Sequence, residues 1–196
     1  MGIALGKVHI SIVSFIPVAV LLLFNPPEYV FAMLFCALLH ETGHLVAMRV
    51  AGVSADRVDI LLFGAKIKMN GYLGYGTDML IYASGAIANL MAALSAYVIY
   101  FNYQSTIVMF VIISNIFYAL FNMLPIRGLD GGEFLECLLM NYFHPYTAWK
   151  TCVWVSYIFT LLLSVISLWL ISISGTNFSL FFITLSLFMG IESEKG

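Results

Sequence analysis

The sequence H-E-T-G-H at residues 40–44 lies inside an apolar run that covers residues 29–48. A charged side chain at bilayer depth costs about 2.5–3.5 kcal/mol on insertion scales, so such residues usually mark function. On a helix, His40 and His44 lie about 40° apart around the axis and can bind one metal ion. Glu41 lies about 60° from His44 on the same side, where it can reach a metal-bound water. The motif therefore predicts a hydrolytic metal site on a membrane helix.

The composition is that of an integral membrane protein. The chain has 196 residues, of which 62% are hydrophobic and 9% are charged. Soluble domains carry roughly 25% charged residues. The net charge of −2 provides no basic patch, so nucleic-acid binding is not expected. The three cysteines suggest no disulfide framework, and Cys36, one turn before His40, is interpreted as a small packing residue rather than a ligand.

Six apolar segments are long enough, or nearly so, to cross a bilayer, which needs about 20 residues. They lie near residues 8–25, 29–50, 78–101, 106–124, 149–173 and 177–191. No small-x-small cleavage site follows the first segment, so we interpret it as an uncleaved span rather than a signal peptide. We therefore predict an all-α polytopic membrane protein with six transmembrane helices.

The basic residues predict the orientation of these spans. Six spans place the N-terminus, the loops near 51–77 and 125–148, and the C-terminus on one side of the membrane. All eight lysines and arginines fall on that side. The positive-inside rule then predicts a multi-pass protein of the cell membrane with both termini in the cytosol. His40 precedes Arg49, at the cytosolic end of its helix, by nine residues, or about 14 Å at 1.5 Å per residue.

Residues 57–69 differ from the spans in having a period of two. Val58, Ile60 and Leu62 alternate with other residues before a Phe-Gly pair at 63–64, and alternation resumes after it. This pattern predicts a small β-hairpin on the cytosolic side, between the second and third helices. The hairpin could rest on the membrane surface, or its edge could accept a substrate peptide by strand addition.

The third predicted span is rich in small residues, which let helices approach closely in lipid. Gly85 and Asn89 are four residues apart and share a helix face. A buried asparagine commonly links helices through a hydrogen bond. Asn89 could instead hold a substrate or an oxyanion, so both interpretations stay open.

A second polar cluster follows the fourth predicted span. Asn122 and Pro125 precede Asp130, and proline cannot continue a helix, so the backbone must break there. Unpaired backbone at membrane depth is tolerated where it lines a cavity. Asp130 could open a short helix, about 131–141, as the N-cap of a capping box with Glu133. Two histidines, however, need a third protein ligand for a catalytic zinc, and Asp130 is the best placed acid.

These motifs together resemble the site-2 proteases, which are intramembrane zinc metalloproteases. The matching stretches are H-E-T-G-H at 40–44, N-M-L-P at 122–125 and L-D-G at 129–131. The sequence S-G-A-I-A-N at 84–89 resembles the family's Gly-Pro-x-x-Asn element, with alanine where proline is common. Within the family, the chain looks most like the branch of stage IV sporulation protein FB.

The resemblance implies a mechanism and partners. One Zn²⁺ per chain would be held by His40, His44 and Asp130, with Glu41 as the general base. Asn89, Asn122 and Pro125 would shape or bind an extended substrate segment. The substrate would be a membrane-tethered protein cut near the cytosolic face. In the sporulation branch it is a sigma factor precursor, cleaved in the mother-cell membrane around the forespore. Membrane-protein inhibitors or regulators are further possible partners, beside the lipid bilayer.

We expect residues 1–196 to form a single metalloprotease domain with its catalytic core at about 29–141. Neither a PDZ insertion nor a C-terminal regulatory domain is expected. The alternative function is a membrane metal transporter or a metal-binding scaffold without proteolysis. A transporter would not need a glutamate beside its first ligand, and it would need a polar route through the non-cytosolic half of the membrane.

Overall fold

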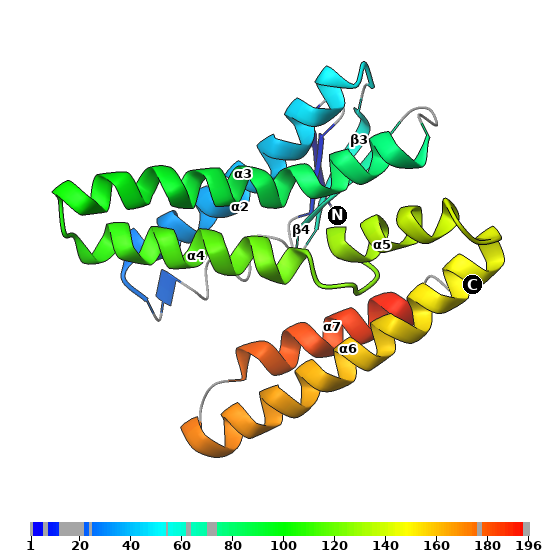
Figure 1. Ribbon diagram of the computed structural model, residues 1–196. Helices are drawn as coiled ribbons and strands as arrows, with labels where there is room; N and C mark the ends of the chain where they lie inside the picture. The colour runs from blue at the N-terminus through cyan, green and yellow to red at the C-terminus, as the bar shows by residue number, and fades with distance from the viewer. Residues whose placement is uncertain are drawn as a thin grey trace. The chain divides into compact units, whose positions relative to one another are not determined.

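The structure is a computed structural model, and its elements are drawn in Figure 1. It describes residues 2–5, 8–11, 22–23, 25–53, 55–61, 64–69, 74–175 and 178–193. The chain divides into two compact units. The first unit comprises residues 1–73 and 84–121, and the second comprises residues 74–83 and 122–196.

The first unit contains three apolar helices. They are α2 (Pro27–Val50), most of α3 (Tyr75–Asn102) and α4 (Thr106–Asn122). Proline at the first helical position starts α2, where its missing N–H costs nothing, and Glu28 and Arg49 complement the helix dipole at the two ends. The buried face of α2 carries both histidines of the motif. Helical spacing therefore turns both histidines of the motif inward.

Glycine lets α2 and α3 approach closely. A Cβ atom added at Gly43 would lie 2.7 Å from the carbonyl oxygen of Ser84 and 2.8 Å from Cβ of Ala88. No larger residue fits at that position without moving α3. On the next interface, Ala93 and Ala96 of α3 are buried with Ile112 of α4. Small residues thus bring the three helices of this unit together, as in other membrane bundles.

A four-stranded sheet completes the first unit, with strands in the order β1-β2-β3-β4. The strands are β1 (Gly2–Leu5), β2 (Val8–Ser11), β3 (Ala55–Leu61) and β4 (Gly64–Met69). β3 and β4 pair antiparallel, with Val58 opposite Ile67, at the residues for which a hairpin is predicted. β2 joins them in parallel to β3 and antiparallel to β1. The hairpin is therefore one part of a larger sheet.

The N-terminal strands correct the predicted first span. Residues 8–11 were expected to begin a transmembrane helix near 8–25, but they form strand β2. Val8 and Ile10 alternate with His9 and Ser11, and this period of two with β-branched residues favours a strand over a helix. The chain is therefore not all-α outside the hairpin. Residues 12–21 and 24 of this predicted span lie outside the described residues.

The second unit is built from α5 (Asp130–Met140), α6 (Pro145–Ser174) and α7 (Ser179–Ser193), with the first residues of α3. Ile126, Val153 and Ile191 form its buried centre. Ile126 comes from the segment between α4 and α5, whereas the other two come from α6 and α7. That segment is therefore anchored by a buried side chain as well as by its flanking helices.

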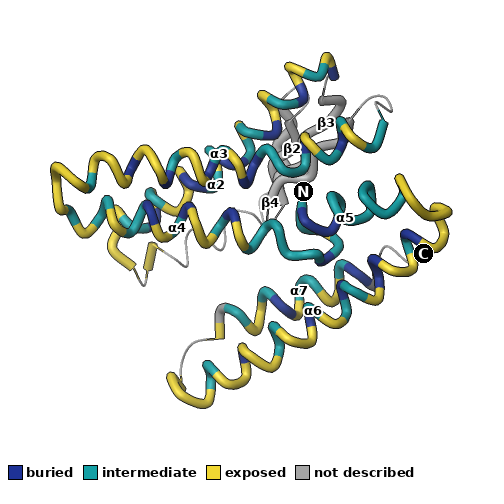
Figure 2. The backbone as a smooth tube through the Cα atoms, in the orientation of Figure 1, coloured by how far each residue is buried: buried dark blue, intermediate teal, exposed yellow. Residues whose placement is uncertain are grey.

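Three helices in the described ranges are long and apolar enough to cross a membrane: α2, α3 and α6. Thr106–Asn122 and Leu180–Ile191 form shorter apolar helices. Figure 2 shows exposed residues along these helices, and many are large and apolar, such as Leu94 of α3 and Leu161 of α6. Apolar surface on this scale indicates a membrane protein rather than a soluble one. The count of six spans stays a prediction.

Candidate metal centre

The two histidines of α2 converge on one point. Their side chains are buried, with 2% of His40 and 6% of His44 exposed. The Nε2 atoms lie 3.1 Å apart, and the rings are nearly perpendicular at 78°. Two nitrogens on a tetrahedral zinc, each about 2.0–2.1 Å from the ion, lie about 3.3 Å apart. The spacing predicted from the sequence thus gives a pair of nitrogens positioned as zinc ligands.

Gly85 of α3 leaves the space beside these nitrogens open. A Cβ atom at this position would lie 2.7 Å from Nε2 of His40 and closer still to Nε2 of His44. Any side chain there would collide with both candidate ligand atoms. The absence of a side chain at Gly85 therefore creates the space in which an ion could be bound. Sequence reasoning noted Gly85 on the face of Asn89 but did not assign it this role.

Hydrogen bonds hold the other nitrogen of each ring. Nδ1 of His40 lies 2.8 Å from Oδ1 of Asn89, and Nδ1 of His44 lies 3.4 Å from the hydroxyl of Ser84. Metal-binding histidines usually bond through their second nitrogen in this way, which orients the ring toward the metal. Both partners come from α3. The ring of Tyr118 from α4 packs edge-on against His40, with 5.1 Å between the ring centroids.

Asn89 is buried and forms hydrogen bonds with three neighbouring residues. Its side chain is completely buried, and its amide nitrogen donates to the carbonyl of Cys36 at 3.0 Å and to Oδ1 of Asn115 at 2.7 Å. With its oxygen against His40, this amide links three helices. The helix-linking interpretation therefore describes its contacts, and a direct contact with substrate stays a prediction. Cys36 is buried and packs in the same network, as predicted.

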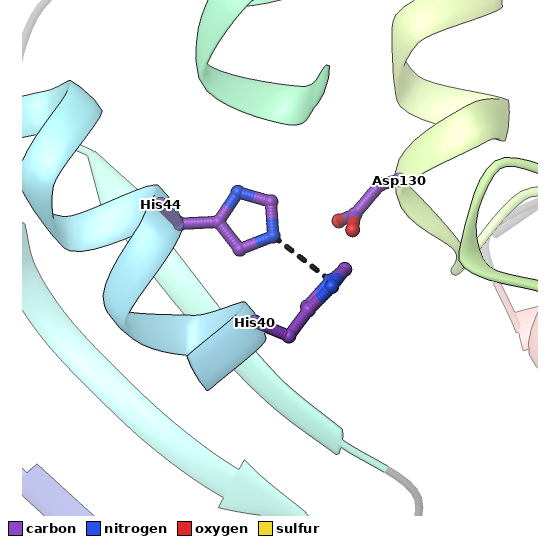
Figure 3. A group of neighbouring side chains, drawn as sticks. All are labelled: His40, His44 and Asp130. Carbon is purple, nitrogen blue, oxygen red and sulfur yellow. Dashed lines mark hydrogen bonds between the residues drawn. The ribbon is translucent and has the colours of Figure 1, made fainter. Parts of the chain in front are cut away.

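Asp130 is the first residue of α5. Leu129 occupies the N-cap position, and no side chain caps this helix end. The interpretation of Asp130 as the N-cap of a capping box is therefore wrong. Asp130 belongs to the second unit and the two histidines to the first, and the three side chains, drawn in Figure 3, are a set of residues that could hold a metal ion. The third ligand chosen from the sequence is thus a member of the candidate metal-binding group.

The segment before Asp130 is an irregular but tightly packed turn, which follows Asn122 at the end of α4 and includes Pro125; both residues are half-buried. A Cβ atom at Gly131 would overlap the carbonyls of Met123 and Leu124. Gly132 packs in the same way against Ile126. Glycines at the start of α5 therefore let this helix sit directly on the backbone that precedes it.

Arg127 fixes the same segment through polar contacts. Its backbone N–H donates to the hydroxyl of Ser156 at 2.9 Å, and its guanidinium forms an ion pair with Glu136 of α5. The side chains of this pair are only 10% and 15% exposed. Sequence reasoning used Arg127 for orientation alone, and no motif indicated that it holds the turn before Asp130.

The donor set fits zinc. Two imidazoles and one carboxylate are a ligand set found in catalytic zinc sites, which keep a further position for water or substrate. Glu41 follows His40 directly and is half-buried. The residues present can therefore supply three ligands and a neighbouring carboxylate for acid–base chemistry.

Comparison with known proteins bears on the fold. No family model and no curated protein matches the sequence. Among solved structures, the site-2 protease from Methanocaldococcus jannaschii superposes with a TM-score of 0.75 at 17% sequence identity. The match covers 99% of this chain and 94% of that protein. The chain therefore has the fold of a site-2 protease over nearly its whole length.

Proposed function

We propose that this chain is an intramembrane zinc metalloendopeptidase of the site-2 protease type, with His40, His44 and Asp130 as the metal ligands. The observation that carries the proposal is the pair of buried Nε2 atoms 3.1 Å apart beside the bare backbone of Gly85. The likeness of the fold to a site-2 protease supports it independently of the motif. Residues 1–196 then act as one catalytic domain with its core at about 29–141.

The chemistry follows from the residues around the pair. A Zn²⁺ ion held by His40, His44 and Asp130 would supply a Lewis acid for the scissile carbonyl and would lower the pKa of a bound water to about 7. Glu41 accepts the proton of the attacking water and delivers it to the leaving amine. Asn89 and Ser84 keep the two imidazoles oriented while the proton moves.

The substrate is proposed to be a membrane-tethered protein, cut near the cytosolic face. A helical segment has its carbonyls engaged in internal hydrogen bonds, so it must unwind before attack. Asn122 and Pro125 would bind the extended segment, and Asn89 would support the site from within. β4 lies at an edge of the sheet and offers backbone groups for strand addition. By resemblance, the substrate is a sigma factor precursor processed during sporulation, under the control of membrane-protein regulators.

The proposed orientation places both termini in the cytosol. The pairing of β2 with β3 supports it, because a sheet requires the N-terminal strands and the loop after α2 to share one side of the membrane. Arg49 in the last turn of α2 marks the cytosolic end. The metal then lies within the membrane, about 14 Å from that end.

The decisive experiment compares the unaltered chain with Glu41→Gln and His44→Ala, each co-expressed with candidate membrane-tethered precursors. The unaltered chain is expected to cleave one precursor and to copurify with one zinc. Glu41→Gln should keep the zinc and lose cleavage, whereas His44→Ala should lose both. Cleavage that persists in Glu41→Gln would refute the role of Glu41. Zinc transport that is unchanged in the same variant would favour a transporter.

A further inference from the structure

A chain of buried amides extends away from the metal side of His40. Asn89 of α3 and Asn115 of α4 are both 0% exposed, and Cys36 of α2 is 1% exposed. A buried amide is costly unless its donors and acceptors are paired, so each of these groups constrains its neighbours. Asn115 lies beyond Asn89 and is connected to His40 through the Asn89 side chain.

The outer end of the chain has a fixed direction. The amide nitrogen of Asn115 donates to the carbonyl of Val111 at 2.9 Å and to the sulfur of Cys36 at 3.1 Å. A carbonyl oxygen can only accept, so the NH₂ group of Asn115 must face Val111. Its oxygen is then left to face Asn89, which donates to it at 2.7 Å.

The same direction continues to His40. The second N–H of Asn89 is used by the carbonyl of Cys36 at 3.0 Å, so both donors of this amide point away from the ring. Oδ1 of Asn89 therefore faces Nδ1 of His40, 2.8 Å away. Because an amide oxygen only accepts, the ring must carry its hydrogen on Nδ1. The lone pair of Nε2 is then available on the side that faces His44.

We propose that Asn115 is a positioning residue that acts through Asn89 to set the tautomer of His40 required for metal binding. The proposal rests on the proposed metal centre, but it concerns only the direction of the hydrogen bonds behind it. Reversing the Asn115 amide would oppose two NH₂ groups at Asn89 and two oxygens at Val111. With Asn115 holding its orientation, Asn89 cannot turn its NH₂ group toward His40 and stabilise the tautomer that has a hydrogen on Nε2.

The test compares two substitutions at one position. Asn115→Leu removes the acceptor for Asn89 and keeps the same number and branching of side-chain heavy atoms. Asn115→Asp, neutral in this buried site, keeps an oxygen toward Asn89 and can donate its O–H to Val111. Asn102→Leu is the matched control, because Asn102 is exposed and its amide nitrogen also donates to the carbonyl four residues earlier, Val98, at 3.2 Å.

The tautomer is measured directly by the ¹⁵N chemical shifts of the histidine rings, in the whole chain freed of metal in detergent. In the unaltered chain and in Asn102→Leu, His40 is expected to carry hydrogen on Nδ1 alone. Asn115→Leu should add the signal of a hydrogen on Nε2, and Asn115→Asp should restore the parent signal. Zinc affinity, measured by chelator competition, should fall about 10–100-fold in Asn115→Leu and at most about threefold in Asn115→Asp.

Several outcomes overturn the proposal. If His40 of the unaltered chain carries its hydrogen on Nε2, the proposal is wrong. That result does not depend on whether Asn115→Leu folds. The proposal is also wrong if Asn115→Leu folds and the tautomer of His40 is unchanged. Equal losses of zinc affinity in Asn115→Leu and Asn115→Asp, with no change of tautomer, would show that Asn115 acts in packing only. Failure of the proposed function is separate, because a parent that shows Nδ1–H but binds no zinc refutes the metal centre and leaves the hydrogen-bond direction established.

Discussion

The two pieces of chain that supply the candidate ligands are held in place by different means. His40 and His44 stand on a regular helix, and their spacing follows from the repeat of α2. Asp130 follows an irregular turn whose backbone is fixed by buried glycines, by Ile126 and by Arg127. Substitutions in α2 should therefore be tolerated as long as the helix face that carries the two imidazole rings is kept. The turn depends on many tertiary contacts, each of which can be broken separately.

Gly85→Ala is expected to have the largest effect of these substitutions, and it acts on the histidine pair of α2 from the neighbouring helix α3. The new Cβ would overlap the Nε2 atoms of both histidines, so we expect at least about a 100-fold loss of zinc affinity and of peptidase activity. Alanine is also a better helix former than glycine by about 1 kcal/mol, so the fold should persist. Zinc affinity by chelator competition and thermal unfolding by circular dichroism measure the two effects.

Gly76→Ala is the control on the same helix, because nothing lies within 4 Å of a Cβ atom at that position. It should leave zinc affinity unchanged. Parent-like zinc binding in Gly85→Ala would show that the space beside the imidazoles is not where the ion binds. The contrast between the histidine pair on α2 and the turn before Asp130 would then lose its basis.

Gly131→Ala tests the turn. Its Cβ would overlap the carbonyls of Met123 and Leu124, so α5 must shift away from the turn. Such overpacking costs about 1–3 kcal/mol, and we expect a lower melting temperature together with about a tenfold loss of zinc affinity. Gly190→Ala in α7, where a Cβ meets nothing within 4 Å, serves as the control. A loss of affinity without a loss of stability would mean that the turn is less tightly coupled to its unit than its packing indicates.

The contrast also explains how far the sequence predicts the molecule. The histidine pair and its helix follow from local periodicity, and Asp130 follows from the need for a third ligand. The strand at residues 8–11 was missed because a run of hydrophobic residues after Lys7 masks a short alternation. Asn115 was missed because no motif includes it. A buried amide in an apolar helix is costly, and that cost is the signal that could have identified it.

Contacts that join distant residues could not be read from local patterns. The ion pair of Arg127 with Glu136 and the hydrogen bond of Arg127 to Ser156 depend on how α5 and α6 pack on the turn. The four-stranded sheet likewise requires residues 8–10 to pair with residues 58–60, about fifty positions later in the chain. Charge and hydrophobicity describe each segment but not which segments meet.

Glu136→Gln should have a smaller effect on zinc affinity than Gly85→Ala or Gly131→Ala. It leaves the guanidinium of Arg127 without its charged partner in a site where both side chains are mostly buried. Leaving such a group poorly satisfied costs about 1–3 kcal/mol, so we expect a lower melting temperature. Zinc affinity should fall less than in Gly131→Ala, because the packing of the glycines is retained. A melting temperature equal to that of the parent would show that the ion pair does not hold the turn.

The smallest effect on the metal centre is expected at Cys137, which reports the electrostatic surroundings of α5. Burial first, and then the acidic side chains of Asp78, Glu133 and Glu136, raises the pKa of this thiol from 9.0 to about 11. At pH 8 the thiolate fraction is then roughly 100-fold below that of an unperturbed thiol, because each pKa unit is a factor of ten.

Iodoacetamide labelling of Cys137, followed by mass spectrometry of the intact chain and of its peptides, should therefore be slow at pH 8 and faster as the pH rises toward 11. The neutral thiol favours the folded state, so its contribution to stability is present below pH 9.0 and is lost as the pH passes about 11. Cys137→Ser should leave zinc affinity unchanged. Rapid labelling at pH 8 would mean that α5 opens to solvent, and the turn before Asp130 would then be held less firmly than α2 holds its two histidines.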